Sequence, residues 1–296
     1  MQSEISSKLL AELNVKLREN GLTQSTINKV EPKSGGSINN AYALITDKER
    51  FFVKINTAGN YPQLFEKEQK GLLLLEKSTS LTIPKTYFID STESNVFLVM
   101  ELIEPGIMKQ DFWEVFAEGL ASLHKRTSNQ FGLEYNNYIG SLVQKNDLKS
   151  DWLTFFVENR LQDQVKMAFD KGLVDLVMLS NFDKLYKKLN SILPVESPSL
   201  IHGDLWSGNF MVGKNGEPVI MDPAVYFGHR EMDIAMMHLF GGFDRKLFET
   251  YNELYPLERG WEKRIEICNL YPLLVHVNLF GGGYVSRVKG VLKGIV

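Results

Sequence analysis

The sequence has a single cysteine, Cys268, so a disulfide within the chain is excluded. Such sparse cysteine usage is typical of proteins in a reducing compartment. Long apolar runs are also missing, because no segment approaches the ~18 apolar residues that a membrane-spanning helix needs. The N-terminal segment contains an early acid, Glu4, and lacks the sustained apolar stretch of a secretory signal. We therefore expect a cytoplasmic protein that does not enter a membrane.

A strong excess of charge is absent as well. The net charge is −3 and 23% of the residues are charged, so nothing indicates a dedicated binder of nucleic acid or of a membrane surface. The densest basic cluster, Lys184, Lys187 and Lys188, has the spacing of a solvated helix face. We expect neither nucleic acid nor membrane as a partner.

The distribution of patterns along the chain predicts two lobes. With 296 residues, 44% of them apolar, the chain is long enough for two lobes that meet at a cleft. Strand patterns dominate up to residue 102, and helical patterns dominate afterwards. We predict an α+β fold with a small β-rich N-terminal lobe (1–102), a hinge near 101–106 and a larger, mainly helical C-terminal lobe (103–296). The expected strands are 41–45, 50–55 and 95–102, with a hairpin inside 200–222, and the expected helices are 3–19, 62–77, 112–124, 151–170, 174–192, 230–240, 245–254 and 262–280.

The segment His202-Gly203-Asp204, followed by Asn209 and Asp222, carries the strongest chemical signal. Phosphoryl transfer requires a base that takes a proton from an acceptor hydroxyl, and oxygen ligands for Mg²⁺ beside the nucleotide phosphates. Asp204 can be that base. Asn209 offers a neutral oxygen ligand, and Asp222, at the end of an apolar strand, offers a charged one. This order is that of a kinase catalytic loop and its metal-binding aspartate.

The N-terminal part of the chain contains residues that could bind the phosphates of the nucleotide. Lys54 lies inside the apolar run 51–55, and a buried ammonium needs an anionic partner. Phosphate oxygens can supply one and Glu68, on the next helix, another; we prefer Glu68 to Glu66 because it shares a helical face with apolar residues. The turn that contains Gly35, Gly36 and Ser37 can lie over the phosphates and offer backbone N–H groups.

Each of these features alone has an ordinary structural explanation. Lys54 could lie at a sheet edge, Asp222 could end a strand, and Asn209 could cap a turn. Their order and spacing together favour a kinase over a purely structural arrangement.

With these residues the chain resembles the fructosamine kinase (ketosamine-3-kinase) family, whose members are related to aminoglycoside phosphotransferases within the protein-kinase-like fold. The resemblance extends over nearly the whole chain and is carried by the segments 202–209, 222–224, 226–233 and 278–284. Two segments are more restricted among proteins than the general phosphotransferase pattern and make the family assignment specific: Trp206-Ser207 and Gly228-His229-Arg230-Glu231.

The resemblance implies an ATP- and Mg²⁺-dependent kinase that phosphorylates the 3-hydroxyl of a ketosamine, either a small molecule or a glycated amine or protein, with a role in deglycation. It implies Asp204 as the base, Asn209 and Asp222 as metal ligands, and Lys54 with Glu68 as the phosphate-binding pair. Met100, Glu101, Leu102 and Ile103 become the hinge that meets adenine. Some relatives carry a redox-active cysteine in the glycine turn. Ser37 stands at or near that place here, so no thiol switch is expected in it.

Further residues keep two interpretations each. Trp206 can stack on a sugar or pack beneath the catalytic loop. His229, Arg230 and Glu231 are candidate substrate contacts, although Arg230 could equally pair with an acid for structural reasons. We expect Asp233 and His202 to hold the catalytic loop, His124 and His276 to be core histidines, and 281–283 to form a bend near the substrate pocket.

Three competing functions follow from the same residues. The first is a kinase for another small amino alcohol or an aminoglycoside, with the same base and metal ligands and a different pocket. The second is a protein kinase, which the short span between Asp222 and Asp233 disfavours because it leaves no room for an activation segment. The third is a nucleotide-binding protein without catalysis, which retention of Lys54, Glu68 and Asp204 disfavours.

Overall fold

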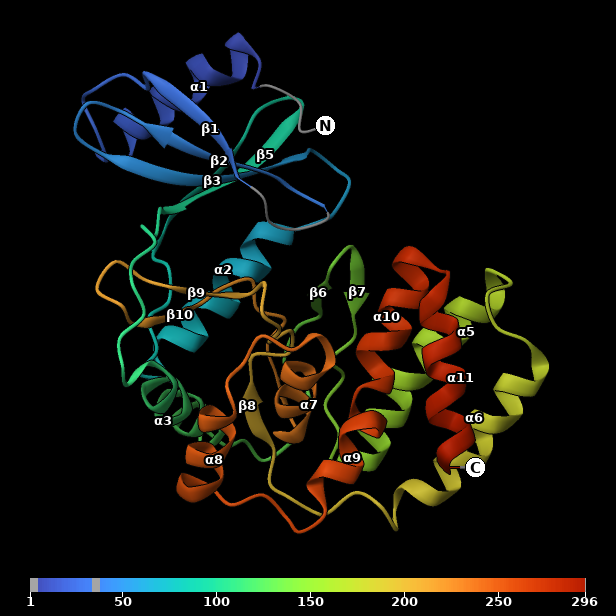
Figure 1. Ribbon diagram of the computed structural model, residues 1–296. Helices are drawn as coiled ribbons and strands as arrows, with labels where there is room; N and C mark the ends of the chain where they lie inside the picture. Colours follow the sequence, from blue (N-terminus) through green and yellow to red (C-terminus); the bar gives the residue numbers. More distant parts are fainter. Residues whose placement is uncertain (1–4, 34–37, 296) are drawn as a thin grey trace.

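The computed structural model describes residues 5–33 and 38–295, which form two lobes joined by an extended segment (Figure 1). The N-terminal lobe is built on one antiparallel sheet with the strand order β1-β2-β3-β5-β4. Its strands are β1 (Lys29–Lys33), β2 (Asn40–Ile45), β3 (Arg50–Thr57), β4 (Thr86–Ser91) and β5 (Asn95–Glu101), and its helices are α1 (Ser7–Glu19) and α2 (Leu64–Glu76).

Side-chain alternation along β3 explains how this sheet is covered and where Lys54 points. Val53 and Ile55 are buried in one apolar cluster with Leu13 and Leu17 of α1. Because successive side chains of a strand point to opposite faces, Lys54 projects to the other face, which α2 covers. The sheet therefore presents one lysine toward the space between the lobes.

The C-terminal lobe is mainly helical, and in its described part three short antiparallel strand pairings hold its loops. Its strands are β6 (Asn137–Ile139), β7 (Leu142–Gln144), β8 (Ser199–Ile201), β9 (Phe210–Val212), β10 (Pro218–Ile220) and β11 (Tyr226–Gly228). Its helices are α3 (Phe112–His124), α4 (Trp152–Phe155), the π-helix η1 (Phe156–Gln162), α5 (Asp163–Asp170), α6 (Leu176–Leu189), α7 (Glu231–Phe240), α8 (Arg245–Leu254), α9 (Trp261–Cys268), α10 (Leu270–Phe280) and α11 (Gly283–Ile295). Of these strands, β9 pairs with β10, β11 with β8 and β6 with β7.

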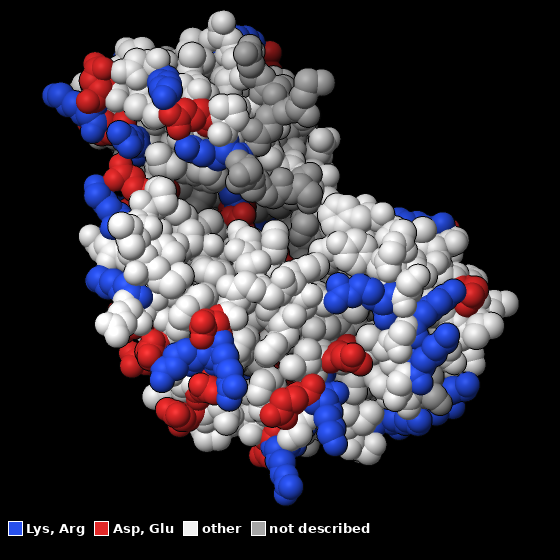
Figure 2. Space-filling model, viewed as in Figure 1, with Lys and Arg blue, Asp and Glu red and all other residues white. Residues whose placement is uncertain are grey.

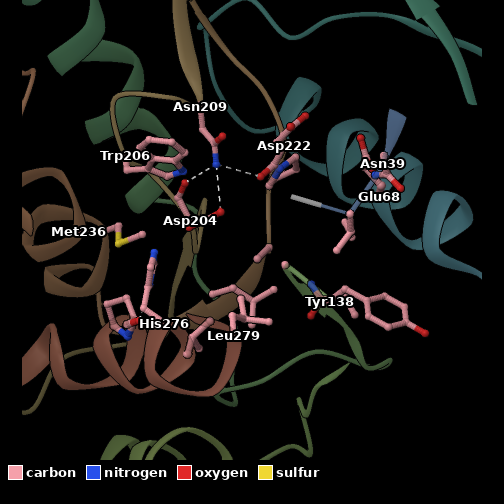
Figure 3. Close-up of a pocket in the computed structure, with 18 of the residues that line it drawn as sticks. Asn39, Glu68, Tyr138, Asp204, Trp206, Asn209, Asp222, Met236, His276 and Leu279 are labelled. Atoms are coloured by element: carbon pink, nitrogen blue, oxygen red, sulfur yellow. Dashed lines mark hydrogen bonds between the residues drawn. The ribbon is translucent and has the colours of Figure 1, made fainter. Parts of the chain in front are cut away.

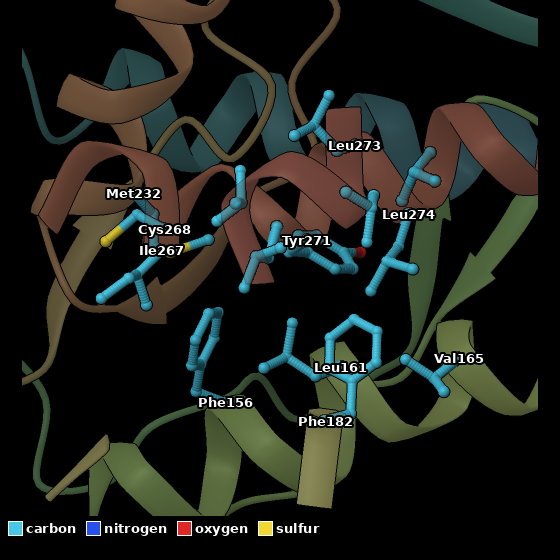
Figure 4. Packing of buried hydrophobic residues seen from close by; sticks show 14 of the residues in the cluster. Phe156, Leu161, Val165, Phe182, Met232, Ile267, Cys268, Tyr271, Leu273 and Leu274 are labelled. Carbon is cyan, nitrogen blue, oxygen red and sulfur yellow. The ribbon is translucent and has the colours of Figure 1, made fainter. Parts of the chain in front are cut away.

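The core of the C-terminal lobe fixes α10, the helix that later supplies one wall of the site. Tyr271 and Leu274 of α10 pack with Leu161 of η1 and Phe182 of α6 in one buried cluster (Figure 4). Burial of each large apolar side chain contributes about 1.5–3 kcal/mol. The position of α10 is thus held by many contacts on its inner face.

Helix α2 connects the two lobes. Its Gly71 packs so closely on the segment after Asp222 that an added Cβ would lie 3.4 Å from side-chain carbons of Pro223 and Val225. The helix that carries Glu68 therefore rests on the C-terminal lobe. None of the helices in the part of the chain that the structure describes is both long and apolar enough to cross a membrane.

The structure confirms most of the expected elements and corrects several. The turn at 213–216 joins β9 to β10 as predicted, with Gly213 N donating to the carbonyl of Glu217 at 2.8 Å. The expected helix 262–280 is two helices, and the π-helix η1 interrupts the expected helix 151–170. Strands β1, β4, β6, β7 and β11 and helix α11 were not predicted, because they are short, charged or rich in glycine and show little periodicity.

Candidate active site

Two loops bring three polar side chains together at the base of the cleft. Asp204 and Asn209 follow β8, and Asp222 follows β10. The Asn209 amide nitrogen donates to the Asp204 backbone carbonyl at 2.8 Å, to the Asp204 carboxylate at 3.0 Å and to the Asp222 carbonyl at 3.4 Å (Figure 3). The predicted catalytic loop and metal-binding aspartate thus lie next to each other.

Asp233 holds the catalytic loop by its backbone, as predicted. Its carboxylate accepts hydrogen bonds from His202 N at 2.7 Å and Gly203 N at 2.9 Å. Burial would raise the pKa of Asp233, but His124, 3.2 Å away, and the Gly203 N–H hold it below its usual range. A buried carboxylate with these donors stays ionised and fixes the loop that presents Asp204.

His202 also orients the loop and is not placed as a base. Its Nε2 lies 3.0 Å from the Met221 carbonyl, which can only accept, and its Nδ1 accepts from Asp204 N at 3.3 Å. Burial lowers the pKa of His202. Both ring nitrogens are used in holding the loops.

The backbone around the site is unusual at two positions. Gly203 has φ of 82°, and a Cβ there would lie 2.1 Å from the Ala224 carbonyl oxygen. Asp222 has φ of 57°, which a non-glycine residue rarely adopts. Glycine is therefore required at 203, and Asp222 is held in a strained conformation that aims its carboxylate into the cleft.

Asp204 is the carboxylate whose pKa is most clearly displaced upward. Burial raises the pKa of Asp204 well above its usual range, and the charges of Asp222 and Asp233 add to the effect, while the Asn209 hydrogen bond opposes it. A raised pKa makes this carboxylate a better proton acceptor once it is ionised.

Lys54 links the two lobes electrostatically. Its ammonium lies 2.6 Å from Glu68 and 2.5 Å from Asp222. Burial lowers the pKa of Lys54, but the two carboxylates outweigh burial and the net shift is upward. Glu66, the alternative partner, is exposed. The preference for Glu68 is confirmed.

A cavity of about 910 Å³ lies under the sheet and against the hinge. It is lined from above by Phe52 and from below by Met211 and Met221, with Lys54 and Asp222 at its inner end. Met100, Glu101, Leu102 and Ile103 all line it, as predicted. Met100 pairs with Phe52 within the sheet, so Leu102 and Ile103, beyond the last residue of β5, are the hinge residues best able to offer backbone groups to a base. Gly35, Gly36 and Ser37 lie outside the described residues.

A second cavity of about 550 Å³ shares Lys54, Trp206, Asn209 and Asp222 with the first. Asp204 lines the second cavity, where Asn209 donates to its carboxylate. Figure 2 shows the hollow between the lobes from outside, with charged atoms at its base. Its far wall is formed by α7, α10 and α11; Figure 3 shows His276 and Leu279 of α10 across from Glu68 and Asn39. One cavity thus faces the hinge and the other faces the helical lobe, with Asp204 in the second cavity next to the residues that the two share.

Trp206, one of the residues that the two cavities share, has 38% of its side chain exposed. Its ring meets that of Phe240 edge-on, with centroids 5.8 Å apart. The indole is therefore packed on one side and open to both cavities on the other, so it remains available for stacking on a bound molecule.

The structure corrects the prediction that His229, Arg230 and Glu231 contact substrate. All three are buried and none lines either cavity. Arg230 pairs with both carboxylate oxygens of Glu196 at 2.8 and 2.9 Å, and Glu231 pairs with Arg264. These paired charges hold the helical lobe together, which is why a narrow sequence motif there need not touch a ligand.

The structure also corrects His276, which was expected to be a core histidine. It lines the second cavity, as do Phe240, Phe280 and Tyr284, which sequence reasoning did not select. The predicted bend is present: Gly281 has φ of 63° and begins the turn into α11. That bend places the end of α10 and the start of α11 side by side at the cavity.

Comparison with known proteins gives the same assignment. A family model described as fructosamine kinase matches residues 10–296. The chain belongs to the fructosamine kinase family. It is 41% identical to a probable ketoamine kinase of Enterococcus faecium, over 90% of this chain and 94% of that one. It is 36% identical to a chloroplastic protein-ribulosamine 3-kinase of Arabidopsis thaliana, over 93% of this chain and 84% of that one.

Solved structures agree with this membership. The crystal structure of a putative fructosamine-3-kinase from Haemophilus somnus aligns with a TM-score of 0.86 and 30% identity, over 96% of each chain. A spectinomycin phosphotransferase aligns with a TM-score of 0.56 and 14% identity, which shows a shared fold only. The predicted α+β, protein-kinase-like fold is confirmed. Enzymes of this family are ATP-dependent phosphotransferases that act on a hydroxyl group.

Proposed function

We propose that this protein transfers the γ-phosphoryl group of ATP to the 3-hydroxyl of a ketosamine. The observation that carries the proposal is the position of Asp204, which lines the second cavity and accepts a hydrogen bond from Asn209, a residue of both cavities. A nucleotide in the first cavity and a sugar in the second would meet at this carboxylate. Relatives named ketoamine kinase and protein-ribulosamine 3-kinase support the substrate class.

The chain's own residues have a limited set of tasks in this reaction. Asp204 accepts the proton of the acceptor hydroxyl as the oxygen attacks the γ-phosphorus. Lys54, held by Glu68, neutralises charge on the phosphates. Asn209 fixes the rotation of the Asp204 carboxylate. Because phosphoryl transfer needs little covalent work from the protein, position and charge supply most of the rate increase.

The polar groups beside the phosphate end of the hinge cavity fit Mg²⁺. The Asn209 amide nitrogen makes its three hydrogen bonds within the catalytic loop and to the Asp222 carbonyl, so its amide oxygen is directed away from them. Asp222 adds a carboxylate, and hard cations prefer such oxygen ligands. We propose Asn209 and Asp222 as the residues that would hold the ion. When bound, Mg²⁺ would neutralise the phosphates and offset the negative charge that develops in transfer.

A ketosamine acceptor also gives the reaction a consequence beyond phosphorylation. If the ketosamine is attached to a protein amine, phosphorylation of its sugar marks that adduct for removal. We propose that the protein acts in the repair of glycated amines, with free small ketosamines as alternative acceptors.

ADP release in the presence of Mg-ATP tests this function directly. Ribuloselysine and fructoselysine are expected to support turnover, whereas kanamycin, choline and a sample without acceptor are expected to give only background. Turnover of kanamycin or choline alone would keep the kinase mechanism and overturn the ketosamine proposal. ATP binding without turnover of any acceptor would favour a nucleotide-binding protein without catalysis.

A further inference from the structure

Five rings line the second cavity in an unbroken series from the catalytic loop to α11. We call Trp206, Phe240, His276, Phe280 and Tyr284 the ring wall. Successive centroids are 5.8 Å apart for Trp206 and Phe240, 5.2 Å for Phe240 and His276, 5.5 Å for His276 and Phe280, and 4.9 Å for His276 and Tyr284. These spacings are those of rings in contact. The wall therefore forms one continuous aromatic surface.

The aromatic side chains of this surface are exposed to solvent to a large extent, although large apolar side chains are usually buried. Phe280 is 56% exposed, and Trp206 and Phe240 are each 38% exposed. Leaving such large apolar rings in water is unfavourable. Rings that are gathered at a cavity and left open there are typical of a surface that a ligand covers.

His276 contributes a hydrogen-bond acceptor to the wall. Its Nδ1 lies 2.7 Å from the Pro272 carbonyl oxygen, and since a carbonyl only accepts, Nδ1 carries the proton. Burial lowers the pKa of His276, the hydrogen bond to the Pro272 carbonyl opposes this, and the Arg287 guanidinium adds to the lowering, so that the net shift is downward. A lowered pKa favours the neutral ring near neutral pH. A neutral ring with its proton on Nδ1 has a lone pair on Nε2. The wall thus combines negative ring faces with one acceptor atom.

The described residues that line the cavity provide no carboxylate on this side. Glu68 and Asp222 are paired with Lys54, and Asp204 faces the reacting hydroxyl. Lys67, on the opposite wall, lies 4.9 Å from the Tyr138 ring centroid. A cation that occupies the space beside α10 and α11 would therefore be held by ring faces and by Nε2, not by an acid of the described chain.

A ketosamine carries such a cation. Its nitrogen is attached to C1, only two carbons from C3, and a secondary alkyl amine is protonated near neutrality. With the 3-hydroxyl at Asp204, the nitrogen and its substituent must lie in the same cavity, and Trp206 begins the wall two residues after Asp204. Cation–π contacts favour an ammonium over a neutral group of the same shape.

We propose that the ring wall is the subsite for the substituted ammonium of the acceptor, with the rings of Phe280 and Tyr284 against the ammonium and the start of its alkyl chain and His276 Nε2 accepting an N–H. This inference rests on the proposed function and deepens it. It makes the protonated amine a recognised part of the substrate, and it assigns that recognition to aromatic side chains.

Two matched acceptors separate this role from simple packing. One is 1-butylamino-1-deoxyfructose, and the other is the ether 1-O-butylfructose, which has the same sugar and chain but no charge. The wild type is expected to prefer the amine at least about tenfold in kcat/KM. Phe280→Leu, which keeps apolar bulk and removes the ring, is expected to reduce that preference about threefold or more, by lowering kcat/KM for the amine more than for the ether.

Two further variants serve as controls. Phe280→Tyr keeps a ring and is expected to retain the preference. Phe169→Ala changes a phenylalanine of α5 that is 38% exposed and does not line the cavity, and it is expected to have no effect on either acceptor. An equal fall in kcat/KM for the amine and the ether in Phe280→Leu would overturn the proposal, as would an unchanged preference.

Calorimetry with unreactive 3-deoxy versions of the two acceptors supplies a readout that does not depend on turnover. Phe280→Leu is expected to weaken binding of the 3-deoxy amine more than binding of the 3-deoxy ether; an equal change for the two compounds, or no change for either, would overturn the ammonium subsite. If the wild type turns over neither reactive acceptor, the proposed ketosamine kinase function fails. The calorimetry then still decides whether the wall holds an ammonium.

Discussion

Asp204→Asn is expected to lower kcat by about 10³-fold or more while leaving ATP affinity nearly unchanged. The substitution removes the carboxylate that lines the second cavity beside the residues shared with the hinge cavity and that we propose as the proton acceptor. It preserves shape, and the Asn209 amide can still donate to an oxygen at position 204. Steady-state turnover of fructoselysine, together with calorimetric titration of ATP, checks both parts.

The same variant is expected to be more thermally stable than the wild type near neutrality. The pKa of Asp204 is raised in the folded protein by burial, so the stability that its protonated form provides is lost as the pH rises through that pKa. Asparagine cannot ionise and avoids this loss. The gain in Tm should shrink at acidic pH, where Asp204 is protonated. Normal turnover by Asp204→Asn would rule out Asp204 as the base, and a lower Tm near neutrality would contradict the described electrostatics.

Lys54→Met is expected to have the second largest effect. It removes the cation that neutralises the phosphates, so kcat/KM for ATP should fall by about 10²–10³-fold. It also leaves Glu68 and Asp222 without their shared partner, which destabilises a buried site by about 3–5 kcal/mol. Activity assays and thermal unfolding measure the two effects.

Double substitution separates the two consequences of losing Lys54. In Lys54→Met, a further Glu68→Gln change should recover part of the lost stability and none of the activity, because it removes one uncompensated carboxylate. Glu66→Gln, on the same helix but exposed, is the matched control and should change neither property. Equal stability of Lys54→Met and the wild type would show that the ion pair contributes nothing to folding.

The residues that sequence predicted well are fixed by short-range rules. Asp204 and Asn209 lie in one loop, so their spacing determines that they meet. Side-chain alternation in β3 and helical periodicity in α2 together direct Lys54 toward Glu68. Asp233 was predicted to hold the catalytic loop because it begins a helix soon after Asp222. In each case a local pattern specifies the direction of a side chain.

The ring wall could not be found in this way because its members come from separate parts of the chain. Trp206, Phe240 and the 276–284 segment are brought together by the packing of α7, α10 and α11 against the catalytic loop. In sequence, His276 and Phe280 have the spacing of an ordinary core-facing helix stripe. Only the tertiary arrangement shows that this side of α10 faces a cavity and that its other side faces the core.

At 229–231 the sequence predicts substrate contacts from a motif specific to the family, and the structure shows buried residues that contact other side chains. Arg230 and Glu231 are specific because each needs a partner distant in sequence, Glu196 and Arg264. A buried ion pair restricts sequence as strongly as a ligand does, since removing either partner leaves an unpaired charge. Motif specificity therefore identified the family correctly and the role of these residues incorrectly.

The position of the phosphate on the product tests the central claim most directly. After reaction of fructoselysine with Mg-ATP, phosphorus–proton correlation NMR is expected to connect the new phosphorus to the proton on C3 of the sugar. That result would place the 3-hydroxyl at the reacting position beside Asp204. A phosphate on any other oxygen, or phosphorylation that persists when the 3-hydroxyl is absent, would contradict the account.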